Sequence, residues 1–243
     1  MGMDDVVYRT DARGGQEIRI ENAVLRVEAV AEGAELSSIW NKETGTEYLW
    51  QADPKWWKRR APILFPFVGR CKDYQYKAKG SVYQMPQHGF ARDMVFDVAE
   101  ASERFITFRL RGDDRTRPVY PWEFCLLVTY SLKGRTLQTA YTVENHDAED
   151  MYFSIGAHPG FKGIRSQSIS LRDRASEHGV TVDLAGFPYL GLWAAPGAPY
   201  VCIEPWYGLA DYDDFEGDIS DKAGIQRLTP GDTFHCRFAV HIV

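Results

Sequence analysis

Three residues of this 243-residue chain have the types and surroundings expected of acid–base groups. His88 and His158 each follow a strand-like run and are flanked by glycine, alanine or proline, in the contexts HGFAR and GAHPGF. Glu204 ends an apolar run and precedes a proline, which holds the preceding residue in an extended conformation and so fixes its direction. Imidazoles and carboxylates are common proton-transfer groups. Turn histidines and a solvated strand-end glutamate are equally compatible with this pattern.

The other four histidines have simpler contexts. His235 and His241 lie on the polar face of an alternating strand, and His146 and His178 lie in polar turns. We therefore expect these four residues to have solvated, structural roles.

Tryptophans lie close to the acid–base candidates in the sequence. Trp56 and Trp57 are adjacent and cannot both face inward from a strand, and Trp206 follows Glu204 by two positions. Aromatic faces bury apolar groups such as the C–H faces of a sugar ring. Trp57 and Trp206 are therefore candidates for substrate binding, with simple core packing as the alternative.

Positive charge is concentrated in one segment, although the net charge of the chain is −6. Between Lys55 and Arg92 there are nine basic residues and one acidic residue. The planar guanidinium group binds two phosphate oxygens at once. Arg92, together with Arg59 and Arg60, therefore favours a negatively charged substrate, unless these arginines pair with acids such as those in 211–214.

Short alternating segments position these residues. Apolar residues recur with period two from Glu17 to Trp50 and again in the last ten residues, and turn residues separate the segments. Tyr76 and Tyr83, either side of Lys79-Gly80, predict a hairpin that brings the loops at Gly69 and His88 to one rim of a sheet. No helical period exceeds two turns. The sequence predicts an all-β fold, an antiparallel sandwich or barrel, in a single domain over residues 1–243.

Composition excludes several functions. The negative net charge argues against nucleic-acid binding, and no apolar run approaches the ~18 residues of a membrane helix. The first residues contain no apolar signal region, and the four scattered cysteines form no CxxC pair. We expect a cytoplasmic protein whose cysteines are reduced and buried.

Six motifs together resemble the aldose 1-epimerase, or mutarotase, family, specifically its shorter bacterial branch. They occur in the order seen in that branch and are GAELSSI, EYLW, PILFPFVGR, HGFARD, GAHPGF and CIEPW. The resemblance implies a large antiparallel β-sandwich with an open concave sugar-binding face. It also implies an isomerase that interconverts the α and β anomers of an aldose without a cofactor or a metal.

The same resemblance implies a role for each site residue. Glu204 matches the family's general base, His158 its general acid, and His88 the second histidine, which binds the sugar. Arg70 matches an arginine that binds sugar hydroxyls. The partner would be a small-molecule sugar or sugar phosphate, and the sequence does not indicate an oligomeric state.

One departure from the family concerns the 45 residues between His158 and Glu204, which are fewer than in the family. The segment 162–167 is where material is predicted to be missing, so an acidic sugar ligand of the family has no counterpart here.

Three alternatives remain open. The first is a non-catalytic carbohydrate-binding protein on the same fold, which a mutarotation assay distinguishes. The second is a hexose-phosphate mutarotase. The third is a metal site of two histidines and a carboxylate, formed by His88, His158 and Glu204, which metal analysis would test.

Overall fold

The computed structural model describes residues 7–10, 16–162, 170–172 and 178–242. Its strands pair antiparallel throughout, so the predicted all-β fold is confirmed. Helices in these residues are confined to the short 3₁₀ turns η2 (Lys72–Tyr74), η3 (Ala91–Asp93) and η4 (Ile219–Asp221). No helix of the described residues is long and apolar enough to span a membrane. Residues 163–167, part of the segment predicted to be shortened, lie outside the description.

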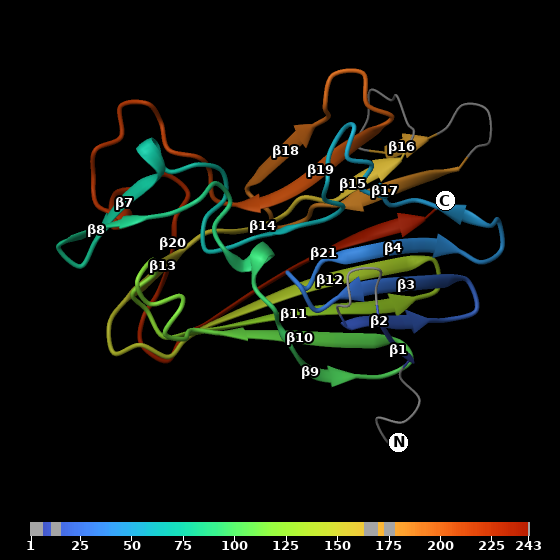
Figure 1. The fold of residues 1–243 in the computed structure, drawn as a ribbon, viewed down its shortest axis with the longest axis horizontal. Helices are drawn as coiled ribbons and strands as arrows, with labels where there is room; N and C mark the ends of the chain where they lie inside the picture. Colours follow the sequence, from blue (N-terminus) through green and yellow to red (C-terminus); the bar gives the residue numbers. More distant parts are fainter. Residues whose placement is uncertain (1–6, 11–15, 163–169, 173–177, 243) are drawn as a thin grey trace.

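Two large sheets form the sandwich and share one hydrophobic core (Figure 1). The first has the order β1-β2-β3-β4-β5, with bounds β1 (Val7–Thr10), β2 (Gln16–Glu21), β3 (Leu25–Val30), β4 (Leu36–Asn41) and β5 (Thr46–Glu47). The second has the order β16-β17-β21-β12-β11-β10-β9, with bounds β9 (Asp97–Ala101), β10 (Phe105–Arg111), β11 (Phe124–Lys133), β12 (Thr136–Asn145), β16 (Ser170–Arg172), β17 (Gly179–Asp183) and β21 (Thr233–Ile242).

Smaller sheets lie at the edge of the sandwich and hold the candidate site (Figure 1). One has the order β15-β19-β14-β6, with β18 paired to β19, and its bounds are β6 (Ile63–Leu64), β14 (Ile155–Ala157), β15 (Gly160–Lys162), β18 (Tyr189–Trp193) and β19 (Tyr200–Tyr207). The two remaining pairs have the bounds β7 (Gln75–Ala78), β8 (Ser81–Gln84), β13 (Met151–Phe153) and β20 (Gln226–Leu228).

The alternation in the sequence corresponds to the two faces of each strand. In β3 the residues Leu25, Val27 and Ala29 are buried while their neighbours are half-exposed, and β12 alternates in the same way over its ten residues. All four cysteines are buried and unpaired, as predicted. Their burial raises the thiol pKa, to about 12 for Cys71 and Cys236.

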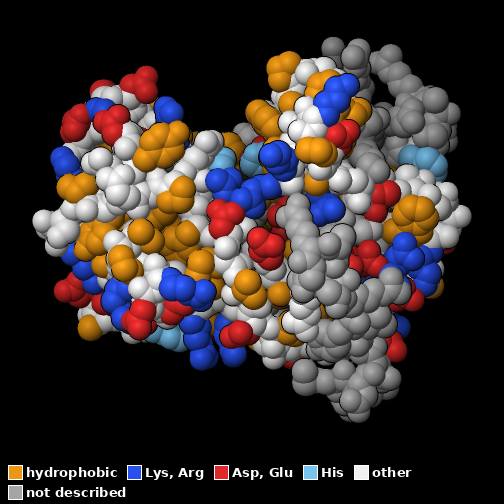
Figure 2. All heavy atoms as spheres, viewed as in Figure 1, with side chains coloured by type: hydrophobic (Ala, Val, Ile, Leu, Met, Phe, Trp, Pro, Cys, Tyr) orange, Lys and Arg blue, Asp and Glu red, His pale blue; other side chains and the backbone are white. Residues whose placement is uncertain are grey.

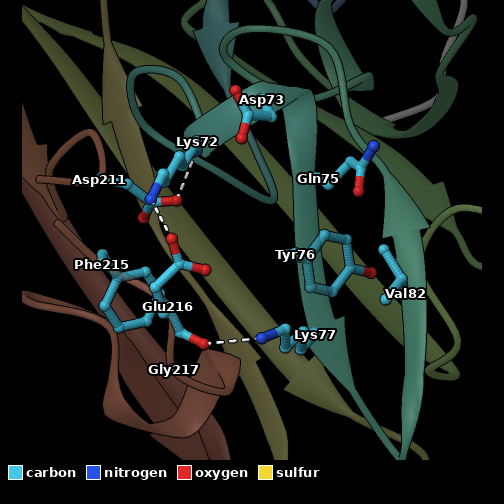
Figure 3. A pocket seen from close by; sticks show the side chains of 10 residues that line it. All are labelled: Lys72, Asp73, Gln75, Tyr76, Lys77, Val82, Asp211, Phe215, Glu216 and Gly217. Atoms are coloured by element: carbon cyan, nitrogen blue, oxygen red, sulfur yellow. Dashed lines mark hydrogen bonds and ion pairs between the residues drawn. The ribbon is translucent and has the colours of Figure 1, made fainter. Parts of the chain in front are cut away.

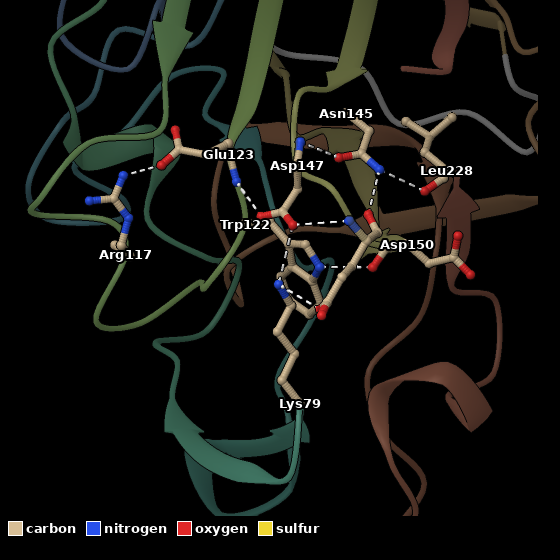
Figure 4. Close-up of polar contacts among 9 residues, drawn as sticks. Lys79, Arg117, Trp122, Glu123, Asn145, Asp147, Asp150 and Leu228 are labelled. Atoms are coloured by element: carbon tan, nitrogen blue, oxygen red, sulfur yellow. Dashed lines mark hydrogen bonds and ion pairs between the residues drawn. The ribbon is translucent and has the colours of Figure 1, made fainter. Parts of the chain in front are cut away.

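The predicted hairpin forms, and it connects the two loops as expected. The N–H of His88 donates to the carbonyl of Gly69 at 2.7 Å, and the N–H of Gly69 donates to Nδ1 of His88 at 3.1 Å. At the turn of the hairpin, the Lys79 ammonium lies 5.2 Å from the Trp122 ring centre and contacts Asp147 and Glu149 (Figure 4). These contacts attach the hairpin to the end of the sandwich.

Asn145 organises this end of the sandwich from a fully buried position (Figure 4). Its amide nitrogen donates to the carbonyls of Glu149 and Leu228, each at 2.9 Å, and its amide oxygen accepts from the N–H of Asp147 at 2.9 Å. All three partners are backbone groups. Buried backbone groups that lose their hydrogen-bond partners cost free energy, so one side chain stabilises both the 145–150 turn and the attachment of β20.

Replacing Asn145 by alanine should lower the free energy of unfolding by about 3 kcal/mol, because three backbone groups lose their partner where water has poor access. Urea denaturation would measure the loss. The matched control is Asn22→Ala, since Asn22 also makes three such bonds but in a half-exposed turn, where water can replace them. Equal losses for the two variants would contradict this account of Asn145.

Candidate active site

Strand β19 changes its partner on one side near its middle. Its first residues, from Tyr200 to Cys202, pair with β15, and its last two residues pair with β14. Between β14 and β15 lie His158 and Pro159, opposite the stretch of β19 that contains Glu204 and Pro205. Proline has no N–H to donate to a ladder, so regular pairing is interrupted here.

The register on both sides of the interruption places the two predicted acid–base residues opposite each other, and they are in contact. Nε2 of His158 lies 3.2 Å from Oε1 of Glu204. The sequence predicts that the strand ends at Glu204, and this is wrong, because β19 continues through Pro205 to Tyr207. On its other side β19 pairs with β18 from Cys202 to Trp206, and this ladder runs past the proline.

The pair is almost completely removed from water. The side chain of Glu204 is 1% exposed and that of His158 is 11% exposed. Rings surround the imidazole of His158, with centres at 5.0 Å for Trp57, 5.6 Å for His88 and 5.7 Å for Trp193. Such burial disfavours the charged form of each group.

Burial shifts the two pKa values in opposite directions. Burial raises the pKa of Glu204 to about 8, although a hydrogen bond from the Trp206 side chain lowers it in part. It lowers the pKa of His158 to about 4, and the positive charge of Arg92 adds to this shift. These shifts favour a shared proton on Glu204 at neutral pH. The roles that the family resemblance implies, a general base at Glu204 and a general acid at His158, require the reverse distribution of the proton.

Both members of the pair also have unused polar atoms. Oε2 of Glu204 and Nδ1 of His158 are buried without a hydrogen-bond partner among the described residues. Buried polar atoms are generally satisfied, so unpartnered ones at one place indicate a position where a ligand binds.

His88 is held as a neutral hydrogen-bond donor. Burial, followed by the charges of His158, Arg92 and Arg59, lowers its pKa to about 3. Because Nδ1 accepts from the N–H of Gly69, the ring proton of the neutral imidazole is assigned to Nε2, which lies 3.3 Å from the side-chain amide of Gln87. The residue also has a left-handed backbone, with φ of 68°, which is uncommon outside glycine.

The remaining predicted site residues surround this centre. Trp57 packs beside His158, while Trp206 lies over the backbones of Gly156 and Gly191, where an added Cβ would come within 2.6 Å and 2.4 Å of its indole. Arg70 is exposed beside Gly69. It therefore lies next to the residue that binds His88.

Arg92 is half-buried, and its guanidinium donates to the carbonyl of Gln87 at 2.6 Å. Two arginines of this segment, Arg59 and Arg92, contact acids, as the alternative required, but these are not the acids expected. Arg59 contacts Asp93 and lies 3.9 Å from Glu35. The acidic partners of Arg59 are therefore its neighbours in space, and they do not belong to the segment 211–214.

Sequence reasoning missed several residues of the site. Trp193 closes one side of the His158 environment, and Cys202 lies beside the pair. No local motif marks Trp193. Cys202 precedes Glu204 by two residues in an alternating strand, and that period-two spacing places both side chains on one face.

A metal site of the expected composition does not form among the described residues. The ligand atoms within 4.8 Å of one another belong to His158, Cys202 and Glu204, without His88. The group that forms therefore differs from the predicted one, with Cys202 in place of His88. Burial, and then the charge of Glu204, raises the pKa of the Cys202 thiol.

The four other histidines lie away from the pair. His146 contacts Glu144 at 2.9 Å, and His235 and His241 each bond a threonine hydroxyl of β12 at 2.9 Å. His178 is half-exposed, before β17. Figure 2 shows the surface hollowed between the part that carries β7 and β8 and the part that carries β18, with histidine side chains on the floor.

Comparisons with known proteins agree with this geometry. The family model described as aldose 1-epimerase matches residues 16–201. Protein LacX (chromosomal) of Lactococcus lactis subsp. lactis is 28% identical over an alignment 287 positions long, which covers 89% of this chain and 96% of LacX. A crystal structure of a galactose mutarotase related enzyme from Lactobacillus acidophilus is 31% identical, with a TM-score of 0.89, over 93% of this chain and 97% of that one.

A third relative is named a putative glucose-6-phosphate 1-epimerase, from Salmonella typhimurium. It is 24% identical over 187 residues, covering 70% of this chain and 60% of the relative. The family model and the Lactobacillus structure each match well over half of this chain. The chain therefore belongs to the aldose 1-epimerase family.

Proposed function

We propose that this protein interconverts the α and β anomers of a hexose or hexose derivative by acid–base ring opening. The observation that carries the proposal is the buried pair of Glu204 and His158, 3.2 Å apart, with one unpartnered polar atom on each residue. Ring opening needs one group that removes a proton from O1 and another that protonates the adjacent ring oxygen. Two such groups in contact, beside aromatic rings, match this requirement.

In the proposed step, one proton leaves the sugar and another is delivered to it. Glu204 removes the proton of the anomeric O1–H, the electron pair forms the C1=O1 bond, and the C1–O5 bond breaks. His158 delivers a proton to O5, which becomes a hydroxyl. Rotation about C1–C2 presents the other face of the aldehyde, and the same steps in reverse close the ring as the other anomer.

This direction of transfer requires the proton to be on His158, whereas burial alone favours Glu204. The two forms of the pair contain the same number of protons and differ only by a transfer over 3.2 Å. A sugar that donates O1–H to the carboxylate and offers O5 to the imidazole stabilises the charged form of both groups. We therefore assign the base role to Glu204 and the acid role to His158 in the sugar complex.

The neighbouring residues would bind the sugar. His88 offers an Nε2–H donor fixed by its backbone contact, and Arg70 offers an exposed guanidinium. Trp57 provides an aromatic face next to His158, suited to the apolar faces of the ring, while Trp206 offers its indole N–H beside Glu204.

A binding protein on the same fold would not need this pair. Removing a carboxylate from water is costly without a compensating partner, and a site that only binds sugar could use an amide instead. A buried pair of acid and base with unsatisfied polar atoms therefore favours catalysis over binding alone.

Glu204→Gln should lower kcat/KM for mutarotation of α-D-glucose or α-D-galactose by about 10²–10⁴-fold, because the amide keeps the shape but cannot accept the O1 proton. Polarimetry measures the rate, and NMR titration should show that sugar binding largely survives. His158→Ala should also reduce kcat strongly. The matched comparison is His88→Ala, which should reduce kcat less, since His88 moves no proton. A Glu204→Gln variant near the wild-type rate would refute the assignment.

The pH profile of kcat/KM should be bell-shaped, with limbs near the pKa values of the pair. Below about pH 4 the pair gains a second proton, on His158, and no longer contains a base. Above about pH 8 the pair loses the shared proton and no longer contains an acid. Activity should be high between these limits, whether the shared proton is on Glu204 or on His158. Progress curves from pH 3.5 to 9.5 would measure this, and a flat profile would contradict the shared-proton pair.

A hexose phosphate is the second candidate substrate. A hollow of about 320 Å³ beside the site includes Arg59, Arg60 and Arg92 in its lining. The Nε of Arg60 is buried without a hydrogen-bond partner among the described residues, whereas Arg59 pairs with acids and the Nε of Arg92 lies 3.8 Å from Asp93. Glu32, Glu35 and Asp93 also line the hollow. Unpartnered guanidinium donors suit phosphate oxygens. The relative named a putative glucose-6-phosphate 1-epimerase adds support.

If the substrate is phosphorylated, glucose 6-phosphate should have a higher kcat/KM than glucose at low salt, and the preference should shrink at high salt, which screens the arginines. Arg60→Gln should reduce the preference, whereas Lys133→Gln, an exposed lysine at the β11–β12 turn, should not. Coupled mutarotation assays with both sugars measure this. Equal values at low salt would exclude the phosphate candidate while leaving glucose mutarotation intact.

A further inference from the structure

Cys202 lies beside the acid–base pair but takes no part in the proton transfers proposed above. It is fully buried and precedes Glu204 by two positions in β19, so the two side chains lie on one side of the strand. One ring nitrogen of His158, the sulfur of Cys202 and one carboxylate oxygen of Glu204 all lie within 4.8 Å of one another. Within the described part of the chain, this is the one such set of three potential metal ligands.

The sheet holds the backbones of these three residues in place without an ion. Cys202 pairs with Gly160 of β15, and Glu204 pairs with Gly191 of β18. His158 stands opposite Glu204 in the register that β14 and β15 share with β19. Ligands on rigid strands are held more precisely than ligands on loops. Only the side chains therefore need to adjust when an ion binds.

The separations within the set are close to those of a zinc site. Zinc binds nitrogen and oxygen at about 2.0–2.2 Å and sulfur at about 2.3 Å, so two ligands of a tetrahedral ion lie about 3.5 Å apart. Nε2 of His158 and Oε1 of Glu204 are 3.2 Å apart. Because no separation in the set exceeds 4.8 Å, a side-chain shift of about 1 Å brings the sulfur of Cys202 into the same range.

The donor atoms select a thiophilic divalent cation. Thiolate and imidazole suit zinc, whereas magnesium and calcium prefer sites made of oxygen atoms. The thiolate of Cys202 and the carboxylate of Glu204 together carry two negative charges, which balance Zn²⁺ and leave the buried site neutral. The positive charge of Arg92 already lowers the pKa of His158, so an ion of higher charge is disfavoured here.

The set also has unused polar atoms. Oε2 of Glu204 and Nδ1 of His158 are buried without a hydrogen-bond partner among the described residues, and the side chain of Glu204 is only 1% exposed. Burial and the charge of Glu204 raise the thiol pKa of Cys202, but coordination to a metal ion deprotonates a thiol outright. Binding therefore exchanges one Zn²⁺ for two protons, one from Cys202 and the one that the pair shares.

The surroundings of the set allow an ion to enter and then exclude water. The side chain of His158 is 11% exposed, so the set is reached from the surface at this residue. The rings of Trp57 and Trp193 lie against the imidazole and provide an apolar wall. Three protein ligands leave one position of a tetrahedral zinc ion open for water.

The cavity of about 110 Å³ beside the hairpin also collects carboxylates, but these already have cationic partners (Figure 3). Lys72 pairs with Glu216, and Asp211 pairs with Lys222 in a nearly fully buried contact. Glu204, in contrast, makes no ion pair with a described lysine or arginine, since its charged-group contact is to His158. The set around Glu204 is therefore the better cation site.

We propose that His158, Cys202 and Glu204 form an inhibitory Zn²⁺ site, which competes with the sugar for the acid–base pair. The bound ion takes the carboxylate and the imidazole of the pair, so Glu204 cannot remove the O1 proton and His158 cannot protonate O5. This inhibition rests on the proposed mutarotase function, whereas binding of the ion rests on the donor set alone. The activity would then depend on the concentration of free zinc.

The first test measures binding of Zn²⁺ to the chelator-treated protein. Isothermal titration calorimetry should show one ion per chain, and Cys202→Ala should weaken this binding at least about tenfold, because only two ligands remain. Co²⁺ gives a second readout, since a thiolate bound to Co²⁺ has a charge-transfer band in the ultraviolet. Cys202→Ser keeps the volume of the side chain and should lack this band.

Cys236→Ala is the matched control. Cys236 is also buried, and burial likewise raises its thiol pKa, but it belongs to no set of metal ligands among the described residues. This variant should bind Zn²⁺ with the wild-type affinity. Thermal unfolding of every variant checks that the fold is unchanged.

The second test measures inhibition, by polarimetry of α-D-glucose with and without Zn²⁺. Inhibition should be competitive with the sugar, because the ion and the sugar need the same atoms of Glu204 and His158. Each variant is compared with its own rate in chelator. The zinc concentration that halves the rate should rise at least about tenfold in Cys202→Ala, in parallel with the loss of affinity.

Glucose turnover that Zn²⁺ does not inhibit, or a zinc affinity unchanged in both Cys202 variants, would overturn the inhibitory site and leave the mutarotase proposal standing. One zinc bound through Cys202, in a protein that turns over neither glucose nor galactose, would support the metal site and refute the mutarotase proposal. Neither zinc binding nor turnover would refute both.

Discussion

The interruption of the β19 ladder is the constraint on which the site depends. The pairing of β19 keeps one register on both sides of the break, and this register places His158 directly opposite Glu204. Pro159 and Pro205 lack N–H donors in the positions that flank this opposed pair. His158 and Glu204 occupy this break, so the reactive groups stand on strands that are rigid just before and after them.

Glycines allow this arrangement to pack. A Cβ on Gly89 would lie 2.2 Å from the carbonyl oxygen of Phe65, and one on Gly33 would lie 2.7 Å from the carbonyl oxygen of Arg92. Both contacts are far too short for a side chain, so only glycine fits. The HGFARD motif thus contains His88, proposed to bind the sugar, and Gly89, which allows close packing, while Gly33 of the GAELSSI motif packs against the backbone of Arg92.

The sequence predicts local features of this fold well because they follow from short-range periodicity. Alternation identifies the strands, and the Lys79-Gly80 turn identifies the hairpin that carries His88 toward Gly69. The continuation of β19 past Pro205 was not predictable, because it depends on pairing with β18, which is set by tertiary structure. The partners of Arg59 were missed for the same reason, since Glu35 and Asp93 are distant in sequence.

The protonation of the pair is the part of the site that the sequence could not indicate at all. It depends on how completely Trp57, Trp193 and the strands exclude water, which is a property of the assembled site. The nearby charge of Arg92 also acts on both histidines and holds them neutral. Burying a neutral pair costs less free energy than burying two ions. The fold can therefore exclude water from both groups until a polar ligand stabilises their charged forms. In the proposed mechanism, the desolvation that shifts the pKa values away from those needed for catalysis would therefore also make the site respond to a bound sugar.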